Sequence, residues 1–295
     1  MWNKMKLYGS IEAGGTKFVC AVGNDKLEII DIIQFPTTKP KETLEMTVNY
    51  FERFKDNLQS VSVASFGPID MVRGSKTYGY ITSTPKLFWD NTNIIGFLKD
   101  RIPVIYYFTT DVNASAFGEM VVRKDVDSLV YYTIGTGIGG GVIQSGHEIG
   151  GVGHGELGHI YVAKHPADYD FDGVCPFHGA CLEGLAAGPS LEARTGIKGE
   201  LIPENHPVWD IQAFYIAQAV MQATLSFRPQ IIVLGGGVMK QSHMLKRVKS
   251  EFIKLLNGYV SIPPIDDYIV LPAVDNNGSA TVGNFWLAKR KLTTD

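Results

Sequence analysis

The chain has 295 residues, of which 45% are hydrophobic and 19% are charged, and its formal net charge is −3 at pH 7. This composition is typical of a globular protein with one large domain or two lobes, and the acidic balance argues against nucleic acid or an anionic membrane as a partner. The apolar runs are too short to span a membrane, and the first ten residues lack the apolar segment of a signal peptide. We therefore expect a cytoplasmic protein whose three cysteines are thiols or metal ligands.

A glycine turn between two apolar strands occurs twice in the chain. Residues 7–18 read LYGSIEAGGTKF, and residues 129–142 repeat the scheme as LVYYTIGTGIGGGV. Glycine turns expose backbone N–H groups and allow a phosphate to approach closely, so two of them predict two contacts with one polyphosphate. A third glycine cluster, at 235–237, follows another apolar strand. The alternative for any single turn is a plain hairpin, and Lys17 is either a phosphate contact or a solvated strand residue.

Strands and helices alternate along the rest of the chain. Expected strands cover residues 7–13, 17–23, 27–35, 61–67, 103–109, 231–237 and 268–273. Expected helices cover residues 40–58, 113–124, 182–194, 209–227, 244–256 and 279 onward. This order predicts an α/β protein of two similar lobes with a ligand cleft between them. We place the N-terminal lobe at 1–112, completed by the helix at 279–295, and the C-terminal lobe at 113–278.

The segment 154–181 is rich in glycine, histidine and cysteine and has no clear periodicity. Three metal-binding side chains recur in it at three-residue intervals: Cys175, His178 and Cys181. A structural zinc ion takes four such ligands, and the fourth is His159 or His154, of which we favour His159. Four protein ligands would leave no position for a catalytic water, so we expect a structural ion. The alternative is a set of unrelated loop residues, while Cys20 lies in an apolar strand and is expected to be a core thiol.

Three carboxylates are candidates for catalysis or substrate binding. Asp111 follows the strand at 103–109 and precedes a helix, a place where a carboxylate can accept the proton of an attacking hydroxyl or cap the helix. Glu156 and Glu183 flank the proposed zinc loop. They can hold sugar hydroxyls through charge-assisted hydrogen bonds, or they are a surface charge and a first-turn acid.

The chain resembles the ROK family of sugar kinases in segments that together span nearly its whole length. These segments are YGSIEAGGTKFVCAVG, SFGPID, TSTPK, TTDVNASAFGE, YYTIGTGIGGG, GHGELGHI, CPFHGACLEGLAAGPSLEARTG and VLGGGVM. The resemblance implies a two-lobed, actin-like (ribonuclease H-like) ATPase fold with its active site in the cleft. It also implies a homodimer, a structural Zn²⁺, and the Mg²⁺-dependent transfer of the γ-phosphate of ATP to the 6-hydroxyl of fructose.

The resemblance also implies roles for individual residues. Asp111 is the implied catalytic base and contacts the sugar. The other implied sugar contacts are Gly67, Pro68, Asn91, Glu156 and Glu183. The implied ATP contacts are Gly14, Gly15, Thr16, Lys17, Thr133, Gly135, Thr136, Gly137, Pro189, Gly235, Gly236, Gly237 and Val238. The implied zinc ligands are His159, Cys175, His178 and Cys181.

Two other functions are compatible with parts of this pattern. One is a kinase for glucose, mannose or an N-acetylated amino sugar, because selectivity would depend on loops within 67–93 and 150–185. The other is a sugar-sensing regulator, since the family includes such proteins. A regulator needs a DNA-reading segment ahead of the first glycine turn, and only a few residues precede that turn here.

Overall fold

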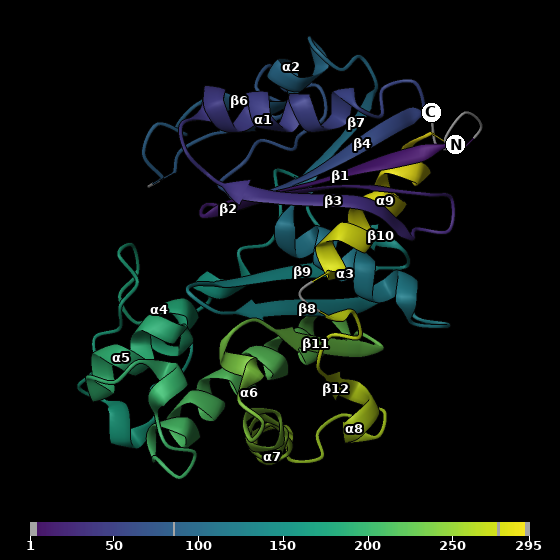
Figure 1. The fold of residues 1–295 in the computed structure, drawn as a ribbon. Helices are drawn as coiled ribbons and strands as arrows, with labels where there is room; N and C mark the ends of the chain where they lie inside the picture. The colour runs from purple at the N-terminus through teal and green to yellow at the C-terminus, as the bar shows by residue number, and fades with distance from the viewer. Residues whose placement is uncertain (1–4, 85, 276–277, 293–295) are drawn as a thin grey trace. The chain divides into compact units, whose positions relative to one another are not determined.

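The computed structural model of the chain describes residues 5–84, 86–275 and 278–292. These residues form two compact units, which Figure 1 shows as a ribbon. Unit 1 comprises the described residues within 1–124, 150–154 and 274–295, and unit 2 comprises residues 125–149 and 155–273. The first break therefore lies twelve residues beyond the expected position after residue 112, so the helix that follows Asp111 belongs to unit 1.

Unit 1 is built on a five-stranded sheet in the order β3-β2-β1-β4-β7. Its strands are β1 (Leu7–Ala13), β2 (Lys17–Gly23), β3 (Ile29–Pro36), β4 (Leu58–Ser65) and β7 (Ile105–Thr110). The first three strands are antiparallel, whereas β4 and β7 run parallel to β1. The carboxyl ends of β1, β4 and β7 therefore meet at one edge of the sheet, where ligands bind in open α/β sheets.

Helices cover both faces of this sheet. Figure 1 shows α1 (Pro40–Glu52) and α2 (Ile94–Lys99) on one face, and α3 (Asp111–Val122) and α9 (Ser279–Lys291) on the other. The short strands β5 (Tyr80–Ile81) and β6 (Thr92–Asn93) pair with each other in the connection that precedes α2. The helix expected at 40–58 ends at Glu52, because a tight turn follows it and Leu58 is already needed as the first residue of β4.

The helices α3 and α9 approach each other unusually closely. A β-carbon on Gly283 would lie 1.8 Å from the carbonyl oxygen of Ala114, and one on Gly118 would lie 1.8 Å from that of Ser279. Glycine is required at both positions because any side chain would push the two helices apart. The C-terminal helix is thereby fixed to the helix that begins with Asp111.

Unit 2 repeats the sheet topology of unit 1. Its sheet has the order β10-β9-β8-β11-β12, with antiparallel pairing from β10 to β8 and parallel pairing from β8 to β12. The strands are β8 (Leu129–Ile134), β9 (Ile138–Gln144), β10 (His147–Glu148), β11 (Ile231–Gly235) and β12 (Ile269–Val270). The strand expected at 268–273 is only two residues long, because α8 (Ile265–Tyr268) occupies the preceding turn.

The helices of unit 2 carry its largest apolar core. They are α4 (Leu182–Ala186), α5 (Gly188–Thr195), α6 (Val208–Phe227), α7 (Met244–Leu256) and α8. The single helix expected at 182–194 is broken at Ala187, whose ψ of 161° is extended, and α5 restarts with Pro189 in its first turn. Proline lacks an N–H and its ring clashes with the carbonyl four residues earlier in a continuous helix, but it fits the first turn of a new helix. No helix in the described part of the chain is both long and apolar enough to cross a membrane.

Candidate functional site

Asp111 lies at the carboxyl end of β7, as the first residue of α3, and its side chain is exposed. Thr110 is the helix cap, because its Oγ1 accepts a hydrogen bond from the backbone N–H of Asn113 at 3.2 Å. The Oδ1 of Asp111 accepts from the Val112 N–H at 2.9 Å. The neighbouring threonine therefore performs the capping role that was the alternative reading of Asp111.

Glu12 is a second carboxylate of unit 1, and the sequence reasoning missed it. It lies in β1, two residues before the first glycine turn, and its Oε1 accepts a short hydrogen bond from Thr281 Oγ1 on α9. The pKa of Glu12 is raised to about 7: desolvation by burial is the main cause and the charge of Asp111 adds to it, while the hydrogen bond from Thr281 and the charge of Lys17 lower the pKa. The sequence signal was an acid in an otherwise apolar strand just before a phosphate-type turn.

The raised pKa of Glu12 predicts a pH-dependent stability. Between about pH 4.5 and about pH 7 the unfolded chain ionises Glu12 and the folded chain does not, so the free energy of unfolding falls as the pH rises through this range. The side chain at position 12 cannot titrate in the variant Glu12→Gln, so the free energy of unfolding of this variant should not show the decrease caused by Glu12. We expect its stability relative to the wild type to rise by about 1–2 kcal/mol between about pH 5.5 and about pH 7.5, measured by urea unfolding without Mg²⁺. A difference that stays constant over this range would contradict the prediction.

The first glycine turn joins β1 to β2. It is closed by a hydrogen bond from the Gly14 N–H to the Lys17 carbonyl at 3.0 Å, and Thr37 Oγ1 donates to the Gly14 carbonyl at 2.6 Å. The Thr37 N–H also donates to the Thr16 carbonyl at 2.9 Å. A β-carbon on Gly15 would meet nothing within 4 Å, so the tip of the turn is open to a ligand. The Lys17 side chain is exposed and donates to Gln34 at 3.2 Å.

The second glycine turn, between β8 and β9, is held by groups from other parts of unit 2. Gly135 accepts from the Gly188 N–H at 2.7 Å, at the start of α5. Glu183 Oε2 accepts from the Ile138 N–H at 2.9 Å. A β-carbon on Gly137 would lie 2.7 Å from the same Oε2, so glycine is needed there for the carboxylate to reach the backbone. Glu183, predicted to bind sugar, thus also fixes the second turn.

The third glycine cluster packs directly against the second turn. Gly236 has a φ of +89°, and a β-carbon there would lie 2.4 Å from backbone atoms of Ile134. A β-carbon on Gly135 would come within 3.7 Å of the Gly237 nitrogen. Thr133 pairs with Gly235 where β8 and β11 run side by side. The structure therefore brings these predicted nucleotide residues together.

A cavity of about 450 Å³ opens beside these two glycine segments in unit 2. Five of the predicted ATP-binding residues line it: Gly135, Thr136, Pro189, Gly237 and Val238. Its other lining residues were not predicted: Gly188, Leu191, Glu192, Lys198, Gly199, Glu200, Trp209 and Gln241. The size is that of a site for a nucleoside-sized ligand.

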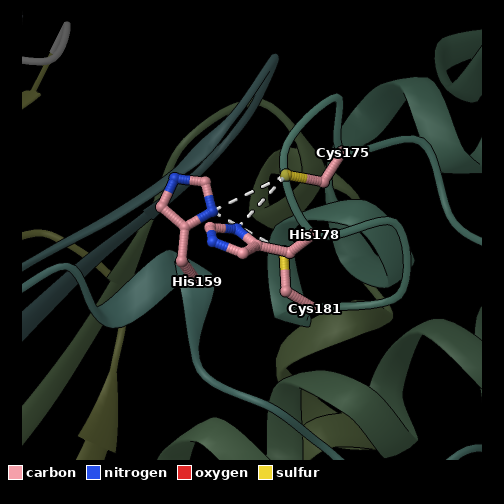
Figure 2. A group of neighbouring side chains, drawn as sticks. All are labelled: His159, Cys175, His178 and Cys181. Carbon is pink, nitrogen blue, oxygen red and sulfur yellow. Dashed lines mark hydrogen bonds between the residues drawn. The ribbon is translucent and has the colours of Figure 1, made fainter.

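The four predicted zinc ligands form one group in the structure. Figure 2 shows their side chains converging, with ligand atoms that all lie within 4.8 Å of one another. Cys175 Sγ lies 3.7 Å from His159 Nδ1 and 3.8 Å from His178 Nδ1, and Cys181 Sγ lies 3.6 Å from His159 Nδ1. Tetrahedral zinc bonds of about 2.3 Å to sulfur and about 2.0 Å to nitrogen give sulfur–nitrogen separations of roughly 3.6 Å. The donor set therefore fits a tetrahedral zinc ion in both chemistry and spacing.

Local structure explains this convergence. His159 ends the 3₁₀ turn η1 (Leu157–His159), and Cys181 is the residue before α4. Cys175 exchanges backbone hydrogen bonds with Gly179, whose φ of +57° closes the tight turn that carries His178. His154 lies outside the group, in unit 1. Cys20 is fully buried, and burial raises the pKa of its thiol to about 12, as expected for an unreactive core residue.

The remaining predicted sugar residues are divided between the two units. In unit 1, Thr82 links Pro68 to Asn91. The Thr82 N–H donates to the Pro68 carbonyl at 2.9 Å, and the Thr82 carbonyl accepts from the Asn91 N–H at 2.9 Å. Gly67 immediately precedes Pro68. In unit 2, the exposed Glu156 immediately precedes η1, and Glu183 lies in the first turn of α4. Both glutamates are therefore close in sequence to a residue of the metal group.

Comparisons with known proteins agree with this arrangement. Residues 8–291 match the ROK family. The chain is 62% identical to a fructokinase of Streptococcus mutans over 97% of its own length and 98% of the relative's. It superposes on the ROK hexokinase of Thermus thermophilus with a TM-score of 0.80, at 23% identity and covering 97% and 99% of the two chains. It superposes with a TM-score of 0.75 on a ROK glucokinase of Streptomyces griseus in complex with glucose and AMPPNP, at 20% identity and with 97% and 99% coverage. The actin-like ATPase fold predicted from the sequence is thereby confirmed.

Proposed function

The chain belongs to the ROK family, and from this membership we propose that it is a fructokinase that transfers the γ-phosphate of ATP to the 6-hydroxyl of D-fructose with Mg²⁺. The observation that carries the proposal is its similarity, over almost the whole chain, to a fructokinase. The test is kcat/KM for fructose, glucose, mannose and N-acetylglucosamine with ATP. Fructose is expected to have the highest value, and a higher value for another hexose would replace the proposed substrate.

Asp111 is proposed to act as the general base. Its exposed carboxylate accepts the proton of the sugar 6-hydroxyl as this oxygen attacks the γ-phosphorus and the bond from the γ-phosphorus to the bridging oxygen of ADP breaks. Positioning and charge compensation contribute most to the rate of such a step. Mg²⁺, when bound, neutralises charge on the phosphates. Glu12, a partly buried carboxylate near Asp111, suits the oxygen chemistry of this ion.

The two units are proposed to contribute different substrate contacts. The cavity of unit 2 takes the nucleoside, with Pro189, Gly235, Gly236, Gly237 and Val238 as the proposed contacts nearer to it. The two glycine turns contact the phosphates through Gly14, Gly15, Thr16 and Lys17 in unit 1 and through Thr133, Gly135, Thr136 and Gly137 in unit 2. The sugar is held by Gly67, Pro68, Asn91, Asp111, Glu156 and Glu183. One carboxylate oxygen of Glu183 accepts from the Ile138 N–H, and we propose that the other receives a sugar hydroxyl.

We propose a structural zinc ion at His159, Cys175, His178 and Cys181. The expected zinc content is about one per chain, because four such ligands complete a tetrahedral site. Cys181→Ser should lower the metal content at least about fivefold and raise KM for fructose, since the loop carries Glu156 and leads into Glu183. The measurement is elemental analysis together with steady-state kinetics.

The controls for the zinc prediction are Cys20→Ala and His154→Ala. The first removes a buried thiol outside the group, and the second removes the rejected fourth ligand. Both should retain the full zinc content. A wild-type chain purified without metal, yet binding fructose normally, would refute the proposed site.

We also propose, from the family resemblance, that the protein is a homodimer located in the cytoplasm. Sedimentation at several concentrations tests the first part, and fractionation of cells tests the second. A protein that sediments as a monomer at micromolar concentration would argue against the dimer.

A further inference from the structure

Phe88 in unit 1 combines two unfavourable features. Its φ is +72°, a left-handed conformation that bulky side chains rarely adopt and that glycine adopts freely. Its aromatic side chain is also 67% exposed, beside Leu87, which is 75% exposed. Strained residues that persist in a fold are concentrated at functional sites, because the surrounding structure must enforce them. The position would suit glycine better for folding alone.

The surroundings of Phe88 do enforce its conformation. The next residue, Trp89, is fully buried, and its Nε1 donates to the Thr38 carbonyl at 2.8 Å. The Trp89 ring packs against Phe18 and Phe66 at centroid distances of 5.4 and 5.8 Å. Lys39, the residue after Thr38, has its Nζ 5.7 Å from the centre of the Phe88 ring. Phe88 is therefore presented on an anchored segment.

The anchors of this segment are neighbours of the residues proposed to bind substrate. Thr38 follows Thr37, which hydrogen-bonds to both Gly14 and Thr16 in the first glycine turn. Phe66 immediately precedes Gly67, and Asn91 is linked to Pro68 through Thr82. The segment that carries Phe88 is thus anchored next to the carboxyl end of β4, on neighbours of the residues proposed to bind sugar.

We propose that Phe88 is a substrate-contact residue whose ring packs against the apolar C–H face of the bound sugar. The proposal rests on the proposed function and extends it to a residue that sets sugar affinity. A sugar ring presents C–H groups that an aromatic face can cover, and covering them buries the surface that Phe88 exposes in the free protein. A contact of this kind is made in the ground state and the transition state alike, so it acts on KM rather than on kcat.

The decisive variant is Phe88→Gly, because it removes the ring and also relieves the positive φ. We expect KM for fructose to rise about tenfold with kcat within about twofold, KM for ATP unchanged, and a melting temperature equal to or above that of the wild type. Phe88→Tyr keeps the ring and should keep KM within about twofold. Tyr259→Ala removes a ring that is 78% exposed in unit 2 and should change nothing.

Four outcomes distinguish a failure of the proposed Phe88 contact from a failure of the proposed fructokinase function. A folded Phe88→Gly variant with an unchanged KM for sugar overturns the role of Phe88, and so does a variant that changes only the association state in light scattering. A wild-type chain that phosphorylates a different hexose overturns the choice of fructose, while a raised KM for that hexose in Phe88→Gly still supports the contact. A wild-type chain that phosphorylates none of the four sugars overturns both.

Discussion

Asp111→Asn should reduce kcat for fructose phosphorylation by about 10³-fold or more, because the amide cannot accept the proton of the attacking hydroxyl. The substitution keeps the size of the side chain and an oxygen able to accept from the Val112 N–H. Thr110 caps α3 independently, so the helix should start unchanged. The measurement is kcat at saturating substrates together with calorimetric titration of ATP, whose affinity should remain close to the wild-type value because the cavity lies in unit 2.

The matched control for this prediction is Asp266→Asn. Asp266 is also an exposed acid in the first turn of a helix, α8, where it forms an ion pair with Lys249 at 2.7 Å. The Asp266 side chain is 86% exposed, so its ion pair contributes little to stability and turnover should stay within about twofold of the wild type. If Asp111→Asn retained more than about a tenth of the wild-type kcat, a different group would have to be the base.

The sequence predicted best those features that depend on residues close to one another in the chain. The three-residue spacing of Cys175, His178 and Cys181 fits a short turn, which the structure closes between Cys175 and Gly179. The glycine turns and their flanking apolar strands likewise follow from local composition. The break between α4 and α5 at Ala187 was readable as well, because Pro189 cannot continue a helix but fits the first turn of a new one.

Features that depend on distant residues were missed for a physical reason. Glu12 has a raised pKa because desolvation and the charge of Asp111 outweigh the hydrogen bond from Thr281, which lowers the pKa, and neither neighbour is visible from β1. The lobe boundary was placed too early because α3 is assigned to unit 1 by its contact with α9, more than 150 residues later in the chain. Lys198 and Trp209 line the cavity only because α5 and α6 fold back beside the glycine segments.

Gly283→Ala should lower the free energy of unfolding by about 3 kcal/mol or more, because the new methyl group would overlap the carbonyl oxygen of Ala114. The obstacle is helix backbone, which cannot rotate away as a side chain would, so α3 and α9 must separate. We expect the melting temperature to fall by roughly 5–10 °C. Gly151→Ala is the control, because its β-carbon would meet nothing within 4 Å and its φ is unstrained, so its stability should be equal or slightly higher.

The same substitution tests whether the helix pair positions Asp111. Separation of α3 from α9 would displace the first turn of α3, which carries Asp111, and Thr281, which holds Glu12. We therefore expect kcat per folded molecule, measured below the thermal unfolding transition, to fall about tenfold or more. The reason is that misplacement of a catalytic group by about 1 Å can reduce the rate about a hundredfold. KM for ATP should change little, because the cavity is formed by unit 2. A variant with wild-type stability would show that the two helices can move apart freely, and a destabilised variant with full kcat would show that Asp111 is held by β7 alone.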